Sequence, residues 1–162
     1  MKLNPDLVVV AFDFNGIVEG LEGLDINYTL LPPAKNFEDV YSQIEKIGVL
    51  IDKADEAADL VSLMKNDVGE IIENFSQENI TVFHEIGFTY GIYTVNENSF
   101  IGEIYNLLGV ENIANLKEDP YGSGYPEFSE EEVINSNPNL IVVGHSDYLN
   151  KDLSSRIGWE EI

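Results

Sequence analysis

Apolar residues recur along the chain in short runs and helical stripes that predict alternating strands and helices. The continuous run Leu7–Phe12 is typical of a strand buried on both faces, and Leu140–Val143 is a second run of this kind. Further strands are predicted at Ile26–Leu31, Ile80–Ile86 and Ile92–Val95. With a short helix over 17–24, the first two strands form a β–loop–α–β unit, which we expect to be parallel and right-handed.

Two longer helical stripes occupy the middle of the chain. Asn36 can cap the first helix, which carries apolar residues at helical spacing up to about residue 51. The second helix is predicted from about Ala54 to Phe75. No proline- or glycine-rich linker separates these helices from the strand predicted at Ile80, so they predict a stiff connection between two lobes.

The second lobe is predicted to contain three helices. One covers Ser99–Leu108, and the last covers 149–157. Between them, Ser129 and Glu132 form a capping box that marks another helix start. The segment 115–127 lacks periodicity and predicts a surface loop.

The two buried strand patterns have similar surroundings. Asn4-Pro5 precedes the first and Asn137-Pro138 the last, and each is followed by a loop with polar and aromatic residues. Two α/β lobes with facing loops would produce this similarity, and ligands of open α/β sheets bind beyond the carboxyl ends of the strands.

Composition narrows the function classes. The 162 residues carry a formal charge of −22, which disfavours nucleic acids and anionic lipids and fits either a salt-adapted surface or a basic partner. There is no cysteine, and the two histidines cannot build a His-rich metal cage. We find no Gly-x-Ser-x-Gly elbow, Walker loop or Gly-x-Gly-x-x-Gly after a strand, so we expect no enzyme. No signal segment is visible, so either the chain stays in the cytosol or its export signal lies outside this sequence.

Four segments in order carry a resemblance to a known family. They are Asn4–Val9, Asn36–Val40 followed by Ala54–Ala57, Tyr93–Ile113, and Tyr125–Val143. Together they resemble the ligand-binding components of ABC importers for cobalamin and iron siderophores, the class III periplasmic binding proteins. The resemblance implies an α/β fold of two Rossmann-like lobes joined by a long helix, and a periplasmic or membrane-anchored extracellular location.

The resemblance also shows a departure from the family pattern. The N-terminal lobe looks incomplete and the C-terminal end looks missing. We therefore expect a partial N-terminal lobe over 1–35, linking helices over 36–78 and a truncated C-terminal lobe over 79–162. Self-association of such a segment is a further expectation.

The resemblance and the strand ends together suggest a ligand site of loop residues. Tyr125 matches the aromatic position of the family's aromatic-Pro-x-x-Ser motif, and a tyrosine offers a rigid apolar face with a polar tip. The expected ligand-binding residues are Phe12, Asp13, Phe14, Leu31, Tyr90, Tyr125 and His145. For each of them, packing or hydrogen bonding within the fold is the competing explanation. His84 is expected to be structural.

The resemblance further implies an ABC permease, a BtuC- or FhuB-like membrane subunit, as partner. Family members carry one surface glutamate on each lobe that pairs with permease arginines. Glu131 matches by position in the Ser-x-Glu motif, and Glu19 matches with a one-residue shift. In so acidic a chain, solvation alone is the alternative role.

The placement of basic residues limits the ligand. None of the eight lies in the predicted cleft loops at 13–16, 87–91 and 122–126. Because an anionic chelate normally needs a cation to offset its desolvation, a neutral or cationic ligand such as cobalamin or a ferric hydroxamate is favoured. We expect no covalently bound cofactor.

Two alternatives remain at this point. One is direct binding of a zinc, manganese or iron ion by Asp13, Glu85, His145 and Asp147, which would have to converge within about 2.0–2.2 Å of one ion. The other is a truncated, non-transport binding module.

Overall fold

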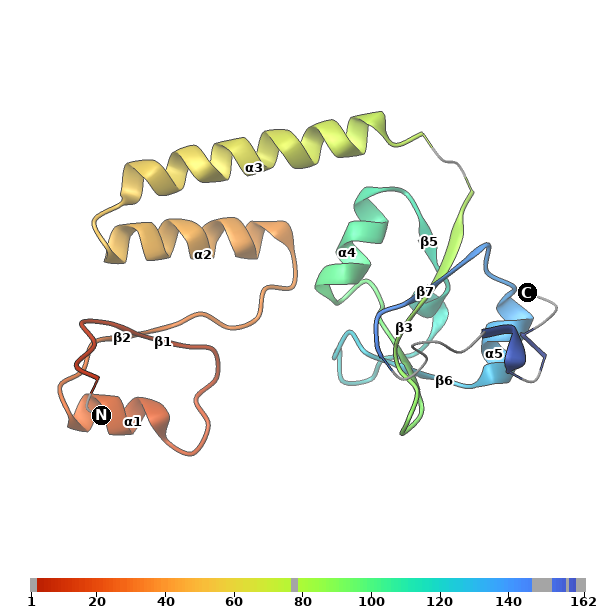
Figure 1. Ribbon diagram of the computed structural model, residues 1–162, viewed down its shortest axis with the longest axis horizontal. Coiled ribbons are helices and arrows are strands. Elements are labelled where there is room, and N and C mark those ends of the chain that lie inside the picture. Colours follow the sequence, from red (N-terminus) through yellow and green to blue (C-terminus); the bar gives the residue numbers. More distant parts are fainter. Residues whose placement is uncertain (1–2, 77–78, 147–152, 157, 160–162) are drawn as a thin grey trace.

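A computed structural model describes residues 3–76, 79–146, 153–156 and 158–159, and its elements form two halves bridged by a long helix (Figure 1). The N-terminal half begins with β1 (Val8–Val10), α1 (Ile17–Gly23) and β2 (Tyr28–Leu30). The two strands pair in parallel, which confirms the predicted parallel pairing. Both are shorter than their apolar runs because only two strands pair here, and the ladder ends where the Leu31 amide donates to the Val10 carbonyl oxygen at 3.0 Å.

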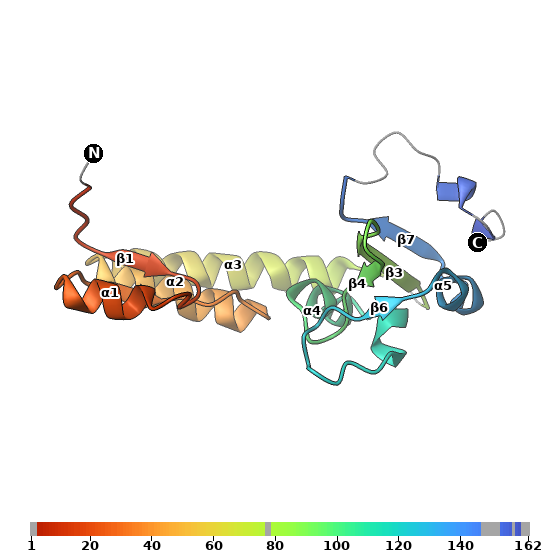
Figure 2. The same ribbon diagram turned by 90° about the horizontal axis from the view of Figure 1, so that it is seen from below.

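The helices α2 (Phe37–Leu50) and α3 (Ala54–Asn74) follow the predicted stripes. The Asn36 side chain accepts the Asp39 amide at 2.7 Å and so caps α2 as expected. The two helices pack closely where the chain reverses, because a Cβ on Gly48 would lie 2.4 Å from the Cβ of Ala57. Figures 1 and 2 both show α3 running from the N-terminal half to the C-terminal half.

The C-terminal half is a mixed sheet around β3 (Thr81–Gly87). Its other strands are β4 (Ile92–Thr94), β5 (Glu111–Asn112), β6 (Glu127–Phe128) and β7 (Leu140–Val143). Strands β5 and β7 are parallel to β3, whereas β4 is antiparallel to both β3 and β6. Since Val82 pairs with both β5 and β7, these two strands lie on opposite edges of β3.

Helices complete this half. They are α4 (Phe100–Leu107), α5 (Glu130–Ser136) and the 3-10 turns η1 (Ile113–Leu116) and η2 (Leu153–Ser155). The capping box at Ser129 and Glu132 is present with both reciprocal bonds, as predicted. The predicted last helix over 149–157 falls partly outside the described residues, and its described part is the three-residue η2 rather than an α-helix.

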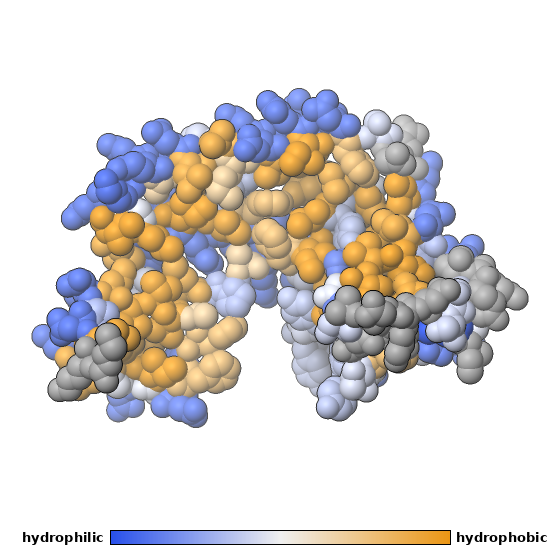
Figure 3. All heavy atoms as spheres, in the orientation of Figure 1, coloured by the Kyte–Doolittle hydropathy of each residue, from blue (hydrophilic) through white to orange (hydrophobic). Residues whose placement is uncertain are grey.

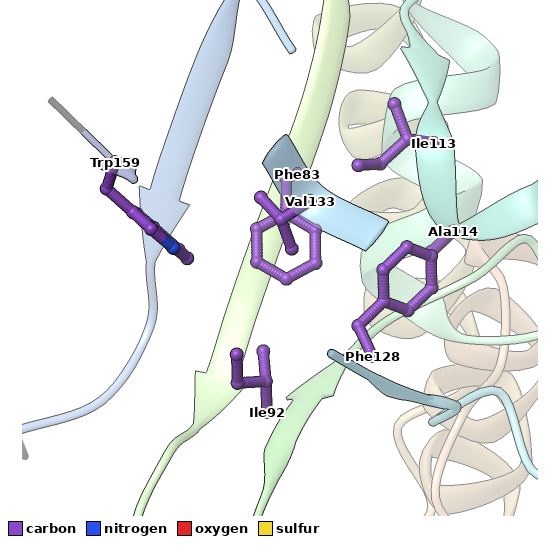
Figure 4. Packing of buried hydrophobic residues seen from close by; sticks show 7 residues of the cluster. All are labelled: Phe83, Ile92, Ile113, Ala114, Phe128, Val133 and Trp159. Atoms are coloured by element: carbon purple, nitrogen blue, oxygen red, sulfur yellow. The ribbon is translucent and has the colours of Figure 1, made fainter. Parts of the chain in front are cut away.

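The main core lies under the C-terminal sheet (Figure 4). Phe83 is fully buried, with its ring centroid 5.6 Å from that of Phe128 and 6.5 Å from that of Trp159. Val133 from α5 and Ile113 from η1 pack against the same cluster. This core makes the C-terminal half a rigid platform for its loops.

The two halves also touch directly. The Phe37 ring at the start of α2 lies 5.1 Å from the Phe100 ring of α4, and the Phe37 amide donates to Glu103 at 2.7 Å. A long helix plus this second contact restrains how the halves move relative to each other. The intervening space opens on the side away from α3 (Figure 3).

Candidate ligand site between the two halves

The loop after β1 presents two aromatic rings to solvent. Phe12 is 52% exposed and Phe14 65% exposed, and their ring centroids lie 5.6 Å apart. The loop is held by its own backbone, because the Phe14 amide donates to the Phe12 carbonyl oxygen at 3.1 Å. Figure 1 shows this loop on the side of the N-terminal half that faces the C-terminal half.

Asp13 stabilises the same loop from within. Its carboxylate accepts the Val18 amide at 3.0 Å, in the first turn of α1. Asn15 and Gly16 both adopt left-handed backbone angles, φ 54° and 72°, which turn the chain into the helix. The bond to Val18 gives Asp13 a structural role within the loop that carries the two phenylalanines. Leu31 is half-buried beside a second hollow of about 250 Å³ against α2.

The C-terminal half contributes a hollow of about 590 Å³ lined by both aromatic and acidic residues. Its walls include Tyr93, Tyr121, Tyr125 and Phe128, with Lys117 and Glu132 at one side. Tyr125, one of the predicted residues, is 51% exposed. Tyr121 is 93% exposed and Tyr93 38%, so three phenol rings are available to a bound molecule.

Backbone bonds fix the position of Tyr125. On one side the Thr94 amide donates to the Pro126 carbonyl oxygen at 3.1 Å, and on the other the Asn96 amide donates to the Gly124 carbonyl oxygen at 3.0 Å. Tyr125 is thus clamped between two bonds to the strand β4 and the residues after it. A loop backbone held in this way loses little freedom on binding a ligand.

Asp119 organises the rest of this loop. Its carboxylate accepts the amides of Gly124 at 2.8 Å and Ser123 at 3.0 Å, the Ser123 hydroxyl at 3.1 Å and the Asn96 side-chain amide at 3.2 Å. The Gly124 amide is the main cause of a lowered pKa for this carboxyl group, with Ser123 and Asn96 adding to it. The segment predicted as an irregular loop is therefore a defined one.

Lys117 brings a positive charge to the hollow that the three predicted cleft loops lack. Its ammonium forms an ion pair with Glu132, and this hydrogen bond is the main cause of the lowered pKa of Glu132. The Lys117 ammonium also lies 5.3 Å from the Phe128 ring centroid. Because a carboxylate and a ring already engage it, the charge is largely offset within the protein.

The remaining predicted ligand residues differ in exposure. Tyr90 is 92% exposed at the turn between β3 and β4. His145, just beyond β7, has a side chain only 9% exposed, and its Nε2 lies 2.6 Å from Oε1 of Glu85. His84 bonds the Tyr105 hydroxyl at 2.8 Å, and burial lowers its pKa. Sequence reasoning missed the partner of Glu85, which is Arg156.

The predicted docking residues lie in different halves. Glu19 is exposed in the first turn of α1, and Glu131 is exposed in the first turn of α5. Both helices lie away from α3, at opposite ends of the molecule (Figures 1 and 2).

The proposed metal site is not assembled by the described residues. No group of three or more His, Asp or Glu side chains suited to a metal ion occurs among them, and Asp147 lies outside the described part. Within the same described part, no helix is long and apolar enough to cross a membrane.

Comparison with known proteins places the chain in a family. The periplasmic binding protein family matches residues 1–162, and the chain belongs to that family of substrate-binding proteins. Over its full length it is 29% identical to an uncharacterized ABC transporter substrate-binding lipoprotein of Bacillus subtilis, of which it covers 52%. Over 89% of its length it is 28% identical to a cobalamin-binding protein of Halobacterium salinarum, of which it covers 39%.

A solved structure supports the same fold. The structure of a possible iron-binding, periplasmic solute-binding protein from Staphylococcus epidermidis superimposes with a TM-score of 0.83 at 23% identity, over 98% of this chain and 63% of that one. The fold is therefore that of the class III periplasmic binding proteins, as the sequence predicted. The chain spans 52% and 39% of the length of these two curated relatives.

Proposed function

We propose that this chain captures a cobalamin or iron-chelate ligand between its two halves, as the substrate-binding component of an ABC importer. The observation that carries the proposal is the supply of exposed aromatic rings by both halves. Phe12 and Phe14 come from one half, and Tyr121 and Tyr125 come from the other. Figure 3 shows an open hollow between the halves, with apolar residues gathered on the N-terminal wall.

The chemistry of these walls suits a large ligand of mixed polarity. Phenylalanine rings provide apolar area, and tyrosine rings add hydroxyl groups that can hydrogen-bond to amides or hydroxamates. Lys117, the cation that lines the same hollow as the tyrosines, is engaged by Glu132. A neutral or cationic ligand therefore fits better than a highly anionic catecholate complex.

We further propose that Glu19 and Glu131 dock the loaded protein onto an ABC permease. Two exposed carboxylates at opposite ends of a restrained body can form charge-assisted bonds to arginines and fix one orientation. Exposure at the first turns of α1 and α5 supports this role. The same proposal implies a location outside the cytoplasmic membrane.

The test is calorimetric titration of the purified chain with cyanocobalamin, haem and ferrioxamine B, a ferric hydroxamate. Saturable 1:1 binding of cyanocobalamin or ferrioxamine B is expected. Calorimetry does not depend on the fluorescence of Trp159, which is 4% exposed and packs in the core. If none of the three ligands binds while the protein is folded, the proposal is wrong.

A further inference from the structure

The hollow of about 590 Å³ in the C-terminal half has a negatively charged wall as well as an aromatic one. Its charged lining residues are four carboxylates and one ammonium group, namely Glu118, Asp119, Glu127, Glu132 and Lys117. Lys117 and Glu132 form an ion pair with each other. The other three carboxylates therefore leave the hollow with a net negative charge, beside the rings of Tyr93, Tyr121 and Tyr125.

Two of these carboxylates are open to a ligand. Asp119 is committed to its own loop through the four hydrogen bonds that its carboxylate accepts. Glu118 and Glu127 are exposed, and none of the ion pairs among the described residues involves either of them. Both can therefore pair with a cation that a bound molecule supplies.

Glu127 lies directly beside the Tyr93 ring. The two residues are paired in the antiparallel register of β6 and β4, so their side chains project from the same face of the sheet. A Cβ added to Gly91 would lie 2.6 Å from Oε1 of Glu127 and 3.4 Å from Cε2 of Tyr93, which places both atoms around one point. Gly91 has a φ of 130° and no side chain, so it leaves room for the carboxylate at the ring.

The same hollow already holds an ammonium group of the protein between a ring and a carboxylate. The Lys117 Nζ lies 5.3 Å from the Phe128 ring centroid and pairs with the Glu132 carboxylate. A ring face attracts a cation electrostatically, and a neighbouring carboxylate adds a charge-assisted hydrogen bond. Tyr93 and Glu127 offer the same two partners, and the Tyr93 ring is 38% exposed. No other lysine or arginine among the described residues lines this hollow.

We propose that Tyr93 and Glu127 bind a protonated amine of the ligand, so that the chain selects an iron chelate with a cationic tail over the neutral form of the same chelate. The exposed phenol rings give such a tail apolar walls along its methylene groups, and its ammonium group ends at the ring and the carboxylate. Glu118 adds a second negative charge to the same hollow. The inference rests on the proposed function, which places the body of the chelate between the two halves.

The experiment compares ferrioxamine B, whose terminal amine is protonated, with the same chelate after acetylation of that amine. Calorimetric titration at fixed ionic strength should show ferrioxamine B binding at least about fivefold more tightly than the acetylated form. Glu127→Gln and Tyr93→Leu should each reduce this preference to about twofold or less. Tyr93→Phe keeps the ring and should keep the preference. Glu111→Gln removes one exposed charge outside the hollow and should also keep it.

These variants separate the site from the formal charge of −22, which attracts every cation. If E127Q and Y93L keep the wild-type preference, or if the wild type binds both chelates equally, the inference is wrong and the proposed function is unaffected. If neither chelate binds, the proposed function fails, and NMR of the Tyr93 ring with pentylammonium, the isolated tail, tests the ammonium site. Saturable shifts that 1-pentanol does not produce support the site, and equal or absent shifts overturn it.

Discussion

The Phe14 ring is the most exposed large apolar group on the loop that faces the cleft, and its removal has a calculable effect on ligand binding. A phenylalanine presents about 200 Å² of surface, of which 65% is exposed here, so about 130 Å² is available. If a ligand covers half of that area, about 65 Å² leaves water on binding. At about 25 cal/mol per Å², Phe14→Ala costs about 1.6 kcal/mol, or roughly 15-fold in Kd.

Leu24→Ala is the matched control for this substitution. Leu24 is 71% exposed and follows the far end of α1, which runs away from the C-terminal half (Figure 1). Calorimetric titration with the ligand that binds the wild type should show no more than a twofold change for L24A. If F14A also stays within twofold of the wild type, the loop after β1 is not a wall of the site.

Three further outcomes are expected from the structure. Glu131→Lys or Glu19→Lys should lower ligand-stimulated ATPase activity of the reconstituted importer at least about tenfold and leave ligand affinity unchanged, whereas Glu73→Lys at the exposed end of α3 should change neither. Glu85→Ala leaves Arg156 buried without its carboxylate and should lower the free energy of unfolding, measured in urea, by roughly 3 kcal/mol or more. The control Glu127→Ala, at an exposed position, should lower it by less than about 0.5 kcal/mol. Equal urea midpoints of unfolding for the two variants would contradict this role of Glu85. The chain exposes 11066 Å², about 3000 Å² more than the roughly 8100 Å² typical of a compact 18.1 kDa protein. Sedimentation velocity should therefore detect a dimer, which should tighten from about 0.1 to 1 M salt because salt screens the charge repulsion between the copies. A monomer at both salt concentrations would refute this expectation.

Local sequence signals predicted the helices well. Asn36 and Ser129 begin their helices as their side chains indicated, since a cap depends on residues only three positions apart. The two-residue strands β5 and β6 were not predicted, and β1 and β2 were predicted too long, because strand length depends on how many partners pair, which no local pattern contains.

The candidate site residues were predictable only where a local sequence pattern or a family motif indicated them. The end of the first predicted strand identified Phe12 and Phe14 as candidates, and the resemblance to the family identified Tyr125. The structure leaves all three exposed. The pairing of Glu85 with Arg156 spans 71 residues and could not be inferred from spacing. The order within the 115–127 segment depends on Asp119, whose bonds to Ser123 and Gly124 are a local turn pattern that could have been recognised.

The central claim is that one ligand is bound by both halves at once. Hydrogen exchange measured by mass spectrometry, with and without a ligand that binds, tests it most directly. The account predicts slower exchange in both the 12–16 loop and the 119–126 loop, with the same dependence on ligand concentration. Protection confined to one half, or found only outside these two loops, would contradict it.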